Sequence, residues 1–378
     1  MSTWLPMFAL PNIEVRRPIE VDGFALASIH DARVQELAEA HPNFREFLSR
    51  FTTEFGKPIV PSVFICRDDA PITYRAIDAI AGFRDAVAMS VIPRSWATVL
   101  QFGNNMGIKY SDYFAVYPWM LDKNFGHLVT ATLNMLGFHM VSELRAQSSA
   151  ALSREIFDMG PLDEPLLEGL LARWQRSFST TTPQSDDIKL FRSLNMANAA
   201  ALLPAGADAT MLDIGRSVAL WSSAFEILAP AKREAYLEVY DLLDKNAWHY
   251  TPCKELKYEA YGFAKDKTLR NLPSWLFGAI NHARNDYLHG NPIDGNRLIV
   301  APAKRPLHYY APLLYRMALA AFIDLQYSPS PKRDDETEYE AYRRNHHVFG
   351  RFQGDIEIAL SSIMYTADEF RAGAHRRG

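Results

Sequence analysis

Three polar side chains of types that act on phosphate esters lie close together in the chain, at Arg284, Asn285 and His289. An arginine stays charged and can bind two phosphate oxygens at once. A histidine can give or take a proton near neutral pH. The amide of Asn285 could hold a phosphate oxygen or fix the ring of His289. Together these groups would suit attack of an RNA 2′-hydroxyl on its neighbouring phosphate, a reaction that needs proton transfer and charge stabilisation but no metal.

The element that must position this set is a predicted helix over residues 274–289. Ser274 is a helix-start signal, and Gly290 is a stop signal. Apolar positions recur at helical spacing and predict a buried face: Leu276, Ile280, Ala283 and Tyr287. Polar positions four apart predict a row opposite that face: Asn281, Asn285 and His289. Arg284 lies on the flank of this row, on a face left free for a substrate or a second subunit.

The same helix also has a purely structural interpretation. A histidine in the last turn beside an arginine often does no more than stabilise the helix dipole. His282 and Asp286 are four residues apart and predict a surface ion pair, with a second acid–base couple as the alternative.

Length and periodicity predict an α+β protein of two domains. The chain has 378 residues, which suits two domains. Residues 1–180 mix strand-like and helix-like segments, and a polar stretch at 177–187 follows them. We therefore predict an N-terminal mixed α/β domain in residues 1–180 and an all-α helical bundle in residues 187–378.

Within these domains the patterns predict individual elements. Strands are expected around the Asp22-Gly23 turn in 13–29 and over 61–66, and helices within 30–55, broken at Pro42, and over 74–91. The type of 113–145 is ambiguous. Further helices are expected in the C-terminal domain: 187–203, 212–228, 232–247, 306–327 and 338–364.

Charge and cysteine content limit the function classes. The net charge of −4 argues against nucleic-acid binding by the whole surface, so an RNA site would be a local groove. Some basic residues could line it, although a solvated helix face is the alternative for each: Lys304, Arg305, Arg343, Arg344 and Arg351. Two cysteines without a CxxC spacing fit a reducing compartment, and no secretory signal or membrane-length apolar run is present. We expect a cytoplasmic protein without membrane contact.

Common cofactor and metal motifs do not occur in the sequence. HExxH, GxGxxG, GxxxxGK[ST] and GxSxG are missing, which argues against the usual zinc protease, dinucleotide, P-loop and hydrolase classes. The adjacent His346 and His347 cannot share a helix face and lack a third ligand at a convincing spacing. We expect no cofactor and no metal, and we interpret Cys66 as a buried structural thiol.

The motif Arg-Asn-x-x-x-His near a helix end resembles the signature of HEPN domains, in which an arginine and a polar residue precede a histidine. The upstream segment from Ser217 to Leu228 contains Ser-Ala-Phe-Glu-x-Leu and is similar to a helix of the Apea-like branch of that family. The resemblance covers about residues 187–327.

This resemblance implies a dimeric helical bundle and a metal-independent endoribonuclease, acting in phage defence or as a toxin. Two signature helices would meet across the dimer axis and form one composite active site. By resemblance, His289 is the general acid and base, Arg284 stabilises the transition state, and Asn285 positions the phosphate or the histidine. Glu226 supports the site, or else it is a packing acid paired with a basic neighbour.

Two alternatives stay open. The chain could be a non-catalytic HEPN scaffold or dimerisation protein, or a regulator that binds a nucleotide without turning it over. Residues 1–180 resemble no family, and their place before an effector-like domain suggests a sensor that binds a regulatory partner.

Overall fold

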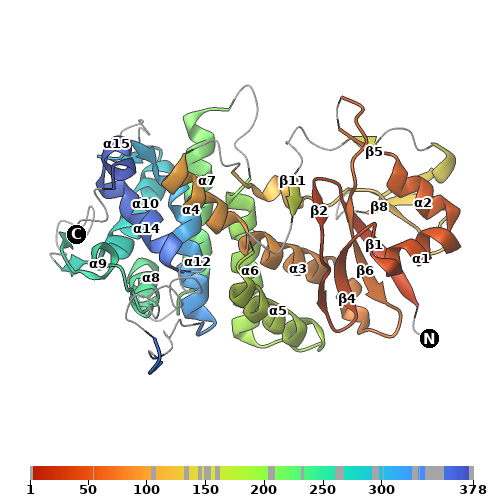
Figure 1. Cartoon of the computed structure of the whole chain (residues 1–378), viewed down its shortest axis with the longest axis horizontal. Coiled ribbons are helices and arrows are strands. Elements are labelled where there is room, and N and C mark those ends of the chain that lie inside the picture. The colour runs from red at the N-terminus through yellow and green to blue at the C-terminus, as the bar shows by residue number, and fades with distance from the viewer. Residues whose placement is uncertain are drawn as a thin grey trace. The chain divides into compact units, whose positions relative to one another are not determined.

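The computed structural model divides the chain into two compact units (Figure 1). Unit 1 is Met1–Arg84, Tyr110–Leu162 and Leu171–Gln184, and unit 2 is Asp85–Lys109, Asp163–Leu170 and Ser185–Gly378. The residues that the structure describes are 3–53, 55–103, 108–131, 136–143, 147–148, 155–157, 162–202, 209–230, 234–259, 268–291, 298–300, 302–325, 331, 333–336 and 353–373.

The division differs in detail from a single cut along the chain. One boundary lies between Gln184 and Ser185, inside the polar stretch that the sequence indicated. Residues 85–109 and 163–170 precede that stretch but belong to unit 2. The reason is packing, because the helix over Ile92–Phe102 (α4) lies against helices from the C-terminal half.

Unit 1 is built on a four-stranded antiparallel sheet with the strand order β1-β6-β4-β3. Its strands are β1 (Trp4–Leu10), β3 (Ile19–Val21), β4 (Phe24–Ser28) and β6 (Ser62–Arg67). Asp22 and Gly23 have φ values of 39° and 82° and form the tight turn between β3 and β4. The strands predicted in 13–29 and 61–66 are confirmed, including the short β2 (Ile13–Val15).

Alternate side chains of the central strands face two apolar layers. On one face, Ala25 and Ile65 join a core cluster with α1 (Ala32–Ala40) and α2 (Pro42–Ser49). Pro42 is tolerated in the first turn of α2, where its missing N–H is not needed, so the predicted break is confirmed.

On the other face, Phe24 packs on Phe83 of α3 (Ile77–Met89) and Trp174 of α5 (Glu164–Phe178), with ring centroids 5.0 and 5.2 Å apart. Burial on both faces explains the continuous apolar runs of β4 and β6. Cys66 is fully buried, as predicted, and burial raises the pKa of its thiol.

The segment of ambiguous type forms strands. β7 (Met120–Leu121), β8 (His127–Ala131) and β9 (Leu136–Met140) make a three-stranded antiparallel sheet, preceded by a 3-10 turn over Ser111–Phe114. Two short parallel pairs complete the described strands of unit 1: β5 (Phe51–Thr52) with β10 (Gln147–Ser148), and β2 with β11 (Glu155–Phe157).

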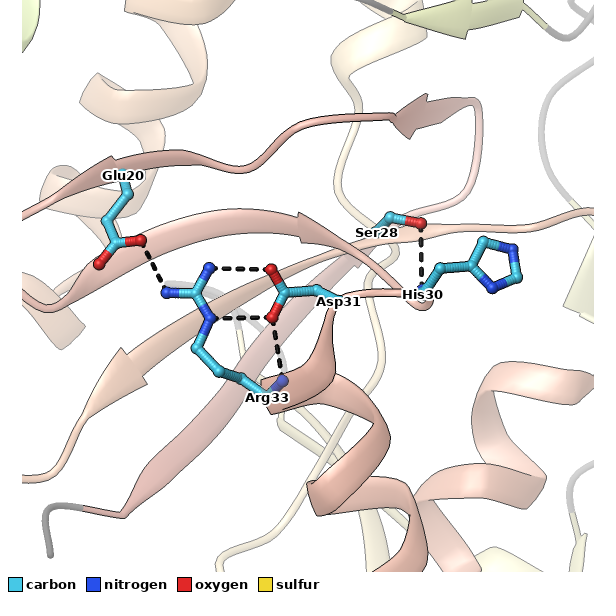
Figure 2. Close-up of polar contacts among 5 residues, drawn as sticks. All are labelled: Glu20, Ser28, His30, Asp31 and Arg33. Atoms are coloured by element: carbon cyan, nitrogen blue, oxygen red, sulfur yellow. Dashed lines mark hydrogen bonds and ion pairs between the residues drawn. The ribbon is translucent and has the colours of Figure 1, made fainter.

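A charged cluster fastens the start of α1 to the sheet. Asp31 caps the helix by accepting the backbone N–H of Arg33 at 3.0 Å. Figure 2 shows the guanidinium of Arg33 between the carboxylates of Asp31 and Glu20, at 2.8 and 2.7 Å. The hydrogen bonds from Arg33 lower the pKa of Asp31. Because Asp31 and Glu20 both bind the single guanidinium of Arg33 and so join α1 to β3, a structural role accounts for the cluster.

Unit 2 is mainly helical (Figure 1), and several of its helices pack against α7 (Met211–Leu228). The helices packed around α7 are α6 (Ser185–Ala200), α8 (Ala235–Asp244), α10 (Leu272–Leu288) and α12 (Ala311–Phe322). Phe225 of α7 contacts Phe277 of α10 and Tyr315 of α12, with ring centroids 5.3 and 5.6 Å apart. These helices confirm the predictions for 187–203, 212–228, 232–247 and 306–327, with ends that differ by a few residues.

Two further short helices pack against α4, namely α14 (Asp355–Ser361) and α15 (Ala367–Arg371). The short helices α9 (Thr251–Lys254) and η7 (Ser362–Met364) pack against α14. The predicted helix over 338–364 is described only from residue 353. Arg343, Arg344, Arg351 and the His346-His347 pair lie outside the described residues.

The prediction that residues 187–378 are all-α is wrong in one respect. β12 (Tyr258–Glu259) pairs with β13 (Leu269–Arg270), and β14 (Ile299–Val300) pairs with β15 (Arg305–Pro306), both antiparallel. These strands are two residues long, too short to show an alternating pattern in the sequence. The coarser expectation of N-terminal strands followed by helices is confirmed. In the part of the chain that the structure describes, no helix is both long and apolar enough to span a bilayer.

Candidate functional site

Helix α10, which carries Arg284, Asn285 and His289, begins earlier than the sequence predicts. Its N-cap is Asn271, whose side-chain oxygen accepts the N–H of Ser274 at 2.9 Å. Ser274, the predicted cap, is inside the first turn and donates its hydroxyl to Asp244 at 3.0 Å. The prediction failed because Pro273 suits the first turn itself, so the helix can start before it.

The C-terminal end of α10 is a Schellman motif. Gly290 has a φ of 70°, in the left-handed region. The N–H of Gly290 donates to the carbonyl of Tyr287 at 3.4 Å, and the N–H of Asn291 donates to that of Asp286 at 3.0 Å. The predicted stop at Gly290 is confirmed, and His289 becomes the last residue before the chain leaves the helix.

The polar row on α10 is shorter than predicted. Asn281 is only 3% exposed, because α10 packs closely on α7 at this turn. The hydroxyl of Ser222 on α7 donates to the amide oxygen of Asn281 at 3.4 Å. Asn281 is therefore part of the helix interface, and the row that solvent reaches consists of the half-buried Asn285 and the exposed His289. Tyr287, predicted to be buried, is also half-buried.

Arg284 joins α10 to α7 through an ion pair. Its Nη2 lies 3.6 Å from Oε2 of Glu226, and the two side chains are 28% and 21% exposed. Its Nη1 donates to the amide oxygen of Asn285 at 2.9 Å. Burial raises the pKa of Glu226, and the charge of Arg284 opposes that shift. Three of the four sequence-predicted site residues therefore lie together: Glu226, Arg284 and Asn285.

One nitrogen of Arg284 has no hydrogen-bond partner in this arrangement of described residues. Its Nε is buried and has no hydrogen-bond partner among the described residues. A buried N–H donor without a partner is costly, and an anion that reached it would satisfy it.

His289 stands apart from the other three residues. Its side chain is exposed and makes no hydrogen bond or ion pair to any residue that the structure describes. The amide oxygen of Asn285 is engaged by Arg284, so Asn285 does not hold the histidine ring through that atom. The imidazole is accessible to a ligand or to a second molecule.

The ion pair expected on the surface of α10 is present, but it is largely buried. Nε2 of His282 lies 3.7 Å from Oδ2 of Asp286, and Asp286 is buried. The other carboxylate oxygen of Asp286 accepts the side-chain amide of Asn291 at 3.1 Å. These contacts tie the last turn of α10 to the chain that follows it, so their role is to hold the helix end.

Sequence reasoning missed a buried carboxylate and a buried ion pair elsewhere in unit 2. The carboxylate of Glu357 accepts the backbone N–H groups of His249 and Tyr250 at 3.0 and 2.6 Å. Burial raises the pKa of Glu357 to about 7 in spite of these bonds. Asp163 and Arg316 form a buried ion pair with Oδ2 and Nε 2.8 Å apart. A charged residue within an apolar run, as in Asp-Ile-Glu-Ile-Ala-Leu around Glu357, was the available signal.

Comparison with known proteins finds no family model, no curated protein and no solved structure that this chain matches.

Proposed function

We propose that the chain is a metal-independent endoribonuclease of the HEPN type, with Arg284, Asn285 and His289 acting on the phosphodiester. The observation that carries the proposal is the end of α10. There, a guanidinium held by Glu226 and Asn285 keeps an unpaired buried N–H, and an accessible imidazole follows in the next turn.

In the proposed reaction, the 2′-hydroxyl oxygen of the substrate bonds to the adjacent phosphorus, and the bond from phosphorus to the 5′-oxygen breaks. One imidazole takes the proton of the 2′-hydroxyl, and a protonated imidazole gives a proton to the leaving 5′-oxygen. Arg284 stabilises the charge that builds on the phosphate oxygens. The products are a 2′,3′-cyclic phosphate and a 5′-hydroxyl.

The two proton transfers support a homodimer. Each chain offers one histidine in this motif, and the side chain of His289 is exposed and makes no hydrogen bond or ion pair to any described residue. A composite active site would then supply one histidine as base and the other as acid.

The biological role that we propose is cleavage of RNA in phage defence or as a toxin. The basis is the HEPN-like motif in a helical unit, and the place of the α/β unit before it in the chain suggests that this unit senses a signal or binds a regulatory partner.

A specific observation favours a second candidate, a non-catalytic helical scaffold. Both contacts that the Arg284 guanidinium makes with described residues are internal, to Glu226 and to Asn285. A half-buried ion pair between two helices is also what packing alone would select.

The test is RNA cleavage in EDTA by the wild-type chain, His289→Ala and Arg284→Ala, with total RNA and a mixed tRNA pool. We expect each substitution to slow cleavage by about 10²- to 10⁴-fold, with cyclic phosphate ends on the wild-type products. His30→Ala, which removes an exposed histidine of unit 1, is the matched control and should cleave normally.

Glu226→Gln tests whether Glu226 acts only by holding Arg284 in position. It removes the charge that holds Arg284 but leaves Arg284 and His289 in place, so we expect a smaller loss than for Arg284→Ala. Equal activity in all variants would contradict the assignment of the site. A wild-type chain that dimerises but cleaves neither RNA pool would favour the scaffold.

A further inference from the structure

A groove of about 660 Å³ opens in unit 2, and its lining shares no residue with the proposed cleavage site. Its walls are the C-terminal end of α4, the turn and second strand of the β14–β15 pair, the 3-10 turn η5 (Leu307–Tyr309) and α15. Helix α15 packs against α4, so two of the walls support each other (Figure 1). The volume lies in the range of natural small-ligand sites.

The groove is positively charged although the chain is acidic overall. Its lining contains Lys304, Arg305 and Arg371, and no carboxylate is among the described residues that line it. The whole chain carries a net charge of −4, so this excess is local. Arg371 has an ion-pair contact with Asp368 at 3.5 Å, but both side chains are exposed and such a pair is weak. The groove therefore attracts an anion.

Two of the cations hold defined positions at the groove. Nη1 of Arg305 donates to the carbonyl of Leu100 at 2.8 Å and to the hydroxyl of Ser362 at 3.1 Å, which holds the guanidinium in place. Lys304 has a φ of 51°, in the left-handed region that favours glycine. A lysine kept at a strained, exposed turn position points to a use for its ammonium group.

Aromatic rings lie beside these cations. Phe102 lines the groove and is 70% exposed. Tyr309 also lines it and is backed by the buried Trp96, with ring centroids 4.5 Å apart. Exposed aromatic faces next to cations are the combination on which proteins stack nucleobases while binding phosphates.

We propose that this groove binds a nucleoside phosphate unit, either as a free nucleotide or within a single-stranded RNA. Lys304, Arg305 and Arg371 hold the phosphate, and the base stacks on Phe102. The proposal does not depend on the cleavage chemistry, since the two sites share no residue.

Binding is measured on the full chain carrying His289→Ala, so that cleavage of the probe cannot interfere. One arm titrates AMP, GMP, CMP and UMP by calorimetry, and the other follows a fluorescein-labelled single-stranded RNA decamer by anisotropy. The variants are Lys304→Gly, Arg371→Gln and Phe102→Ser. Lys304→Gly removes the charge and relieves the backbone strain, so a loss of binding cannot come from a loss of fold. Lys245→Gln removes an exposed charge outside the groove lining and is the control.

We expect Lys304→Gly and Arg371→Gln each to weaken binding about tenfold, because each removes a charge-assisted phosphate contact. Phe102→Ser should weaken nucleotide binding but leave binding of inorganic pyrophosphate unchanged. If the groove variants weaken the binding of a mononucleotide, the ligand is a free nucleotide. If they weaken only the binding of the decamer, the ligand is an RNA strand. The proposal is overturned if neither probe binds, or if the groove variants bind as tightly as Lys245→Gln.

Discussion

Glu357→Gln tests the buried carboxylate of α14, and its effect can be worked out from the surroundings of that group. Glu357 is fully buried and accepts hydrogen bonds from the backbones of His249 and Tyr250 and from the side chain of Gln353. Burial nevertheless dominates, and it raises the pKa of Glu357 from 4.5 to about 7. Glutamine keeps the size of the side chain and resembles the protonated carboxyl.

The sign of the pH effect follows from the raised pKa. Between pH 4.5 and 7 the folded chain keeps a proton on Glu357 that the unfolded chain releases. The stabilising contribution of this proton is complete below pH 4.5 and is lost as pH rises through about 7. At about 1.4 kcal/mol per pH unit, a shift of this size amounts to about 3 kcal/mol in the free energy of unfolding.

Urea unfolding, followed by circular dichroism at several values between pH 5 and 8, measures the effect. We expect the free energy of unfolding of Glu357→Gln, relative to wild type, to rise by about 2–3 kcal/mol from pH 5 to pH 8. Glu168→Gln, at an exposed position of α5, should show no such trend. A difference between wild type and Glu357→Gln that stays constant with pH would refute the argument that burial outweighs the three hydrogen bonds.

Three further substitutions test individual supports of unit 2. Asp163→Asn leaves the buried Arg316 without its partner at 2.8 Å and should lower the free energy of unfolding, measured in urea, by about 3–5 kcal/mol. Gly290→Ala places a side chain in open space at a φ of 70°, so backbone strain alone should lower the free energy of unfolding by about 1 kcal/mol, as measured by thermal melts. An unchanged melting temperature would contradict the Schellman motif at the end of α10. Thr210→Ala removes the capping box that Thr210 forms with Asp213 and should lower the free energy of unfolding, measured by urea titration, by about 1 kcal/mol. Thr210→Ser keeps a hydroxyl at the cap and should keep most of this free energy.

Local rules predicted most elements of this chain correctly. The Asp22-Gly23 turn, the break at Pro42 and the end of α10 at Gly290 each depend on backbone angles that neighbouring residues impose within one turn. The helices of unit 2 could be predicted from the sequence because their apolar residues recur at helical spacing. The two-residue strands β12 to β15 could not be predicted, since they are shorter than one complete repeat of an alternating pattern.

Local rules did not predict the exposure and the contacts of the candidate site residues. The sequence places Asn281, Asn285 and His289 on one face of α10, but the packing of α7 decides which of them solvent reaches. Asn281 is buried against Ser222, and Arg284 turns to Glu226, a residue on another helix. Such contacts join residues far apart in the chain, so no periodicity encodes them.

By itself, the sequence determined where the main helices and strands lie and which residues share a face, because hydrogen bonding and side-chain direction repeat along one element. Only the tertiary structure decided how far Glu226 and Glu357 are buried, and burial sets the cost of their charge. It also brought the end of α4, the turn at Lys304 and helix α15 around one groove. A residue's pKa and its exposure depend on what packs against it, and packing is a property of the whole fold.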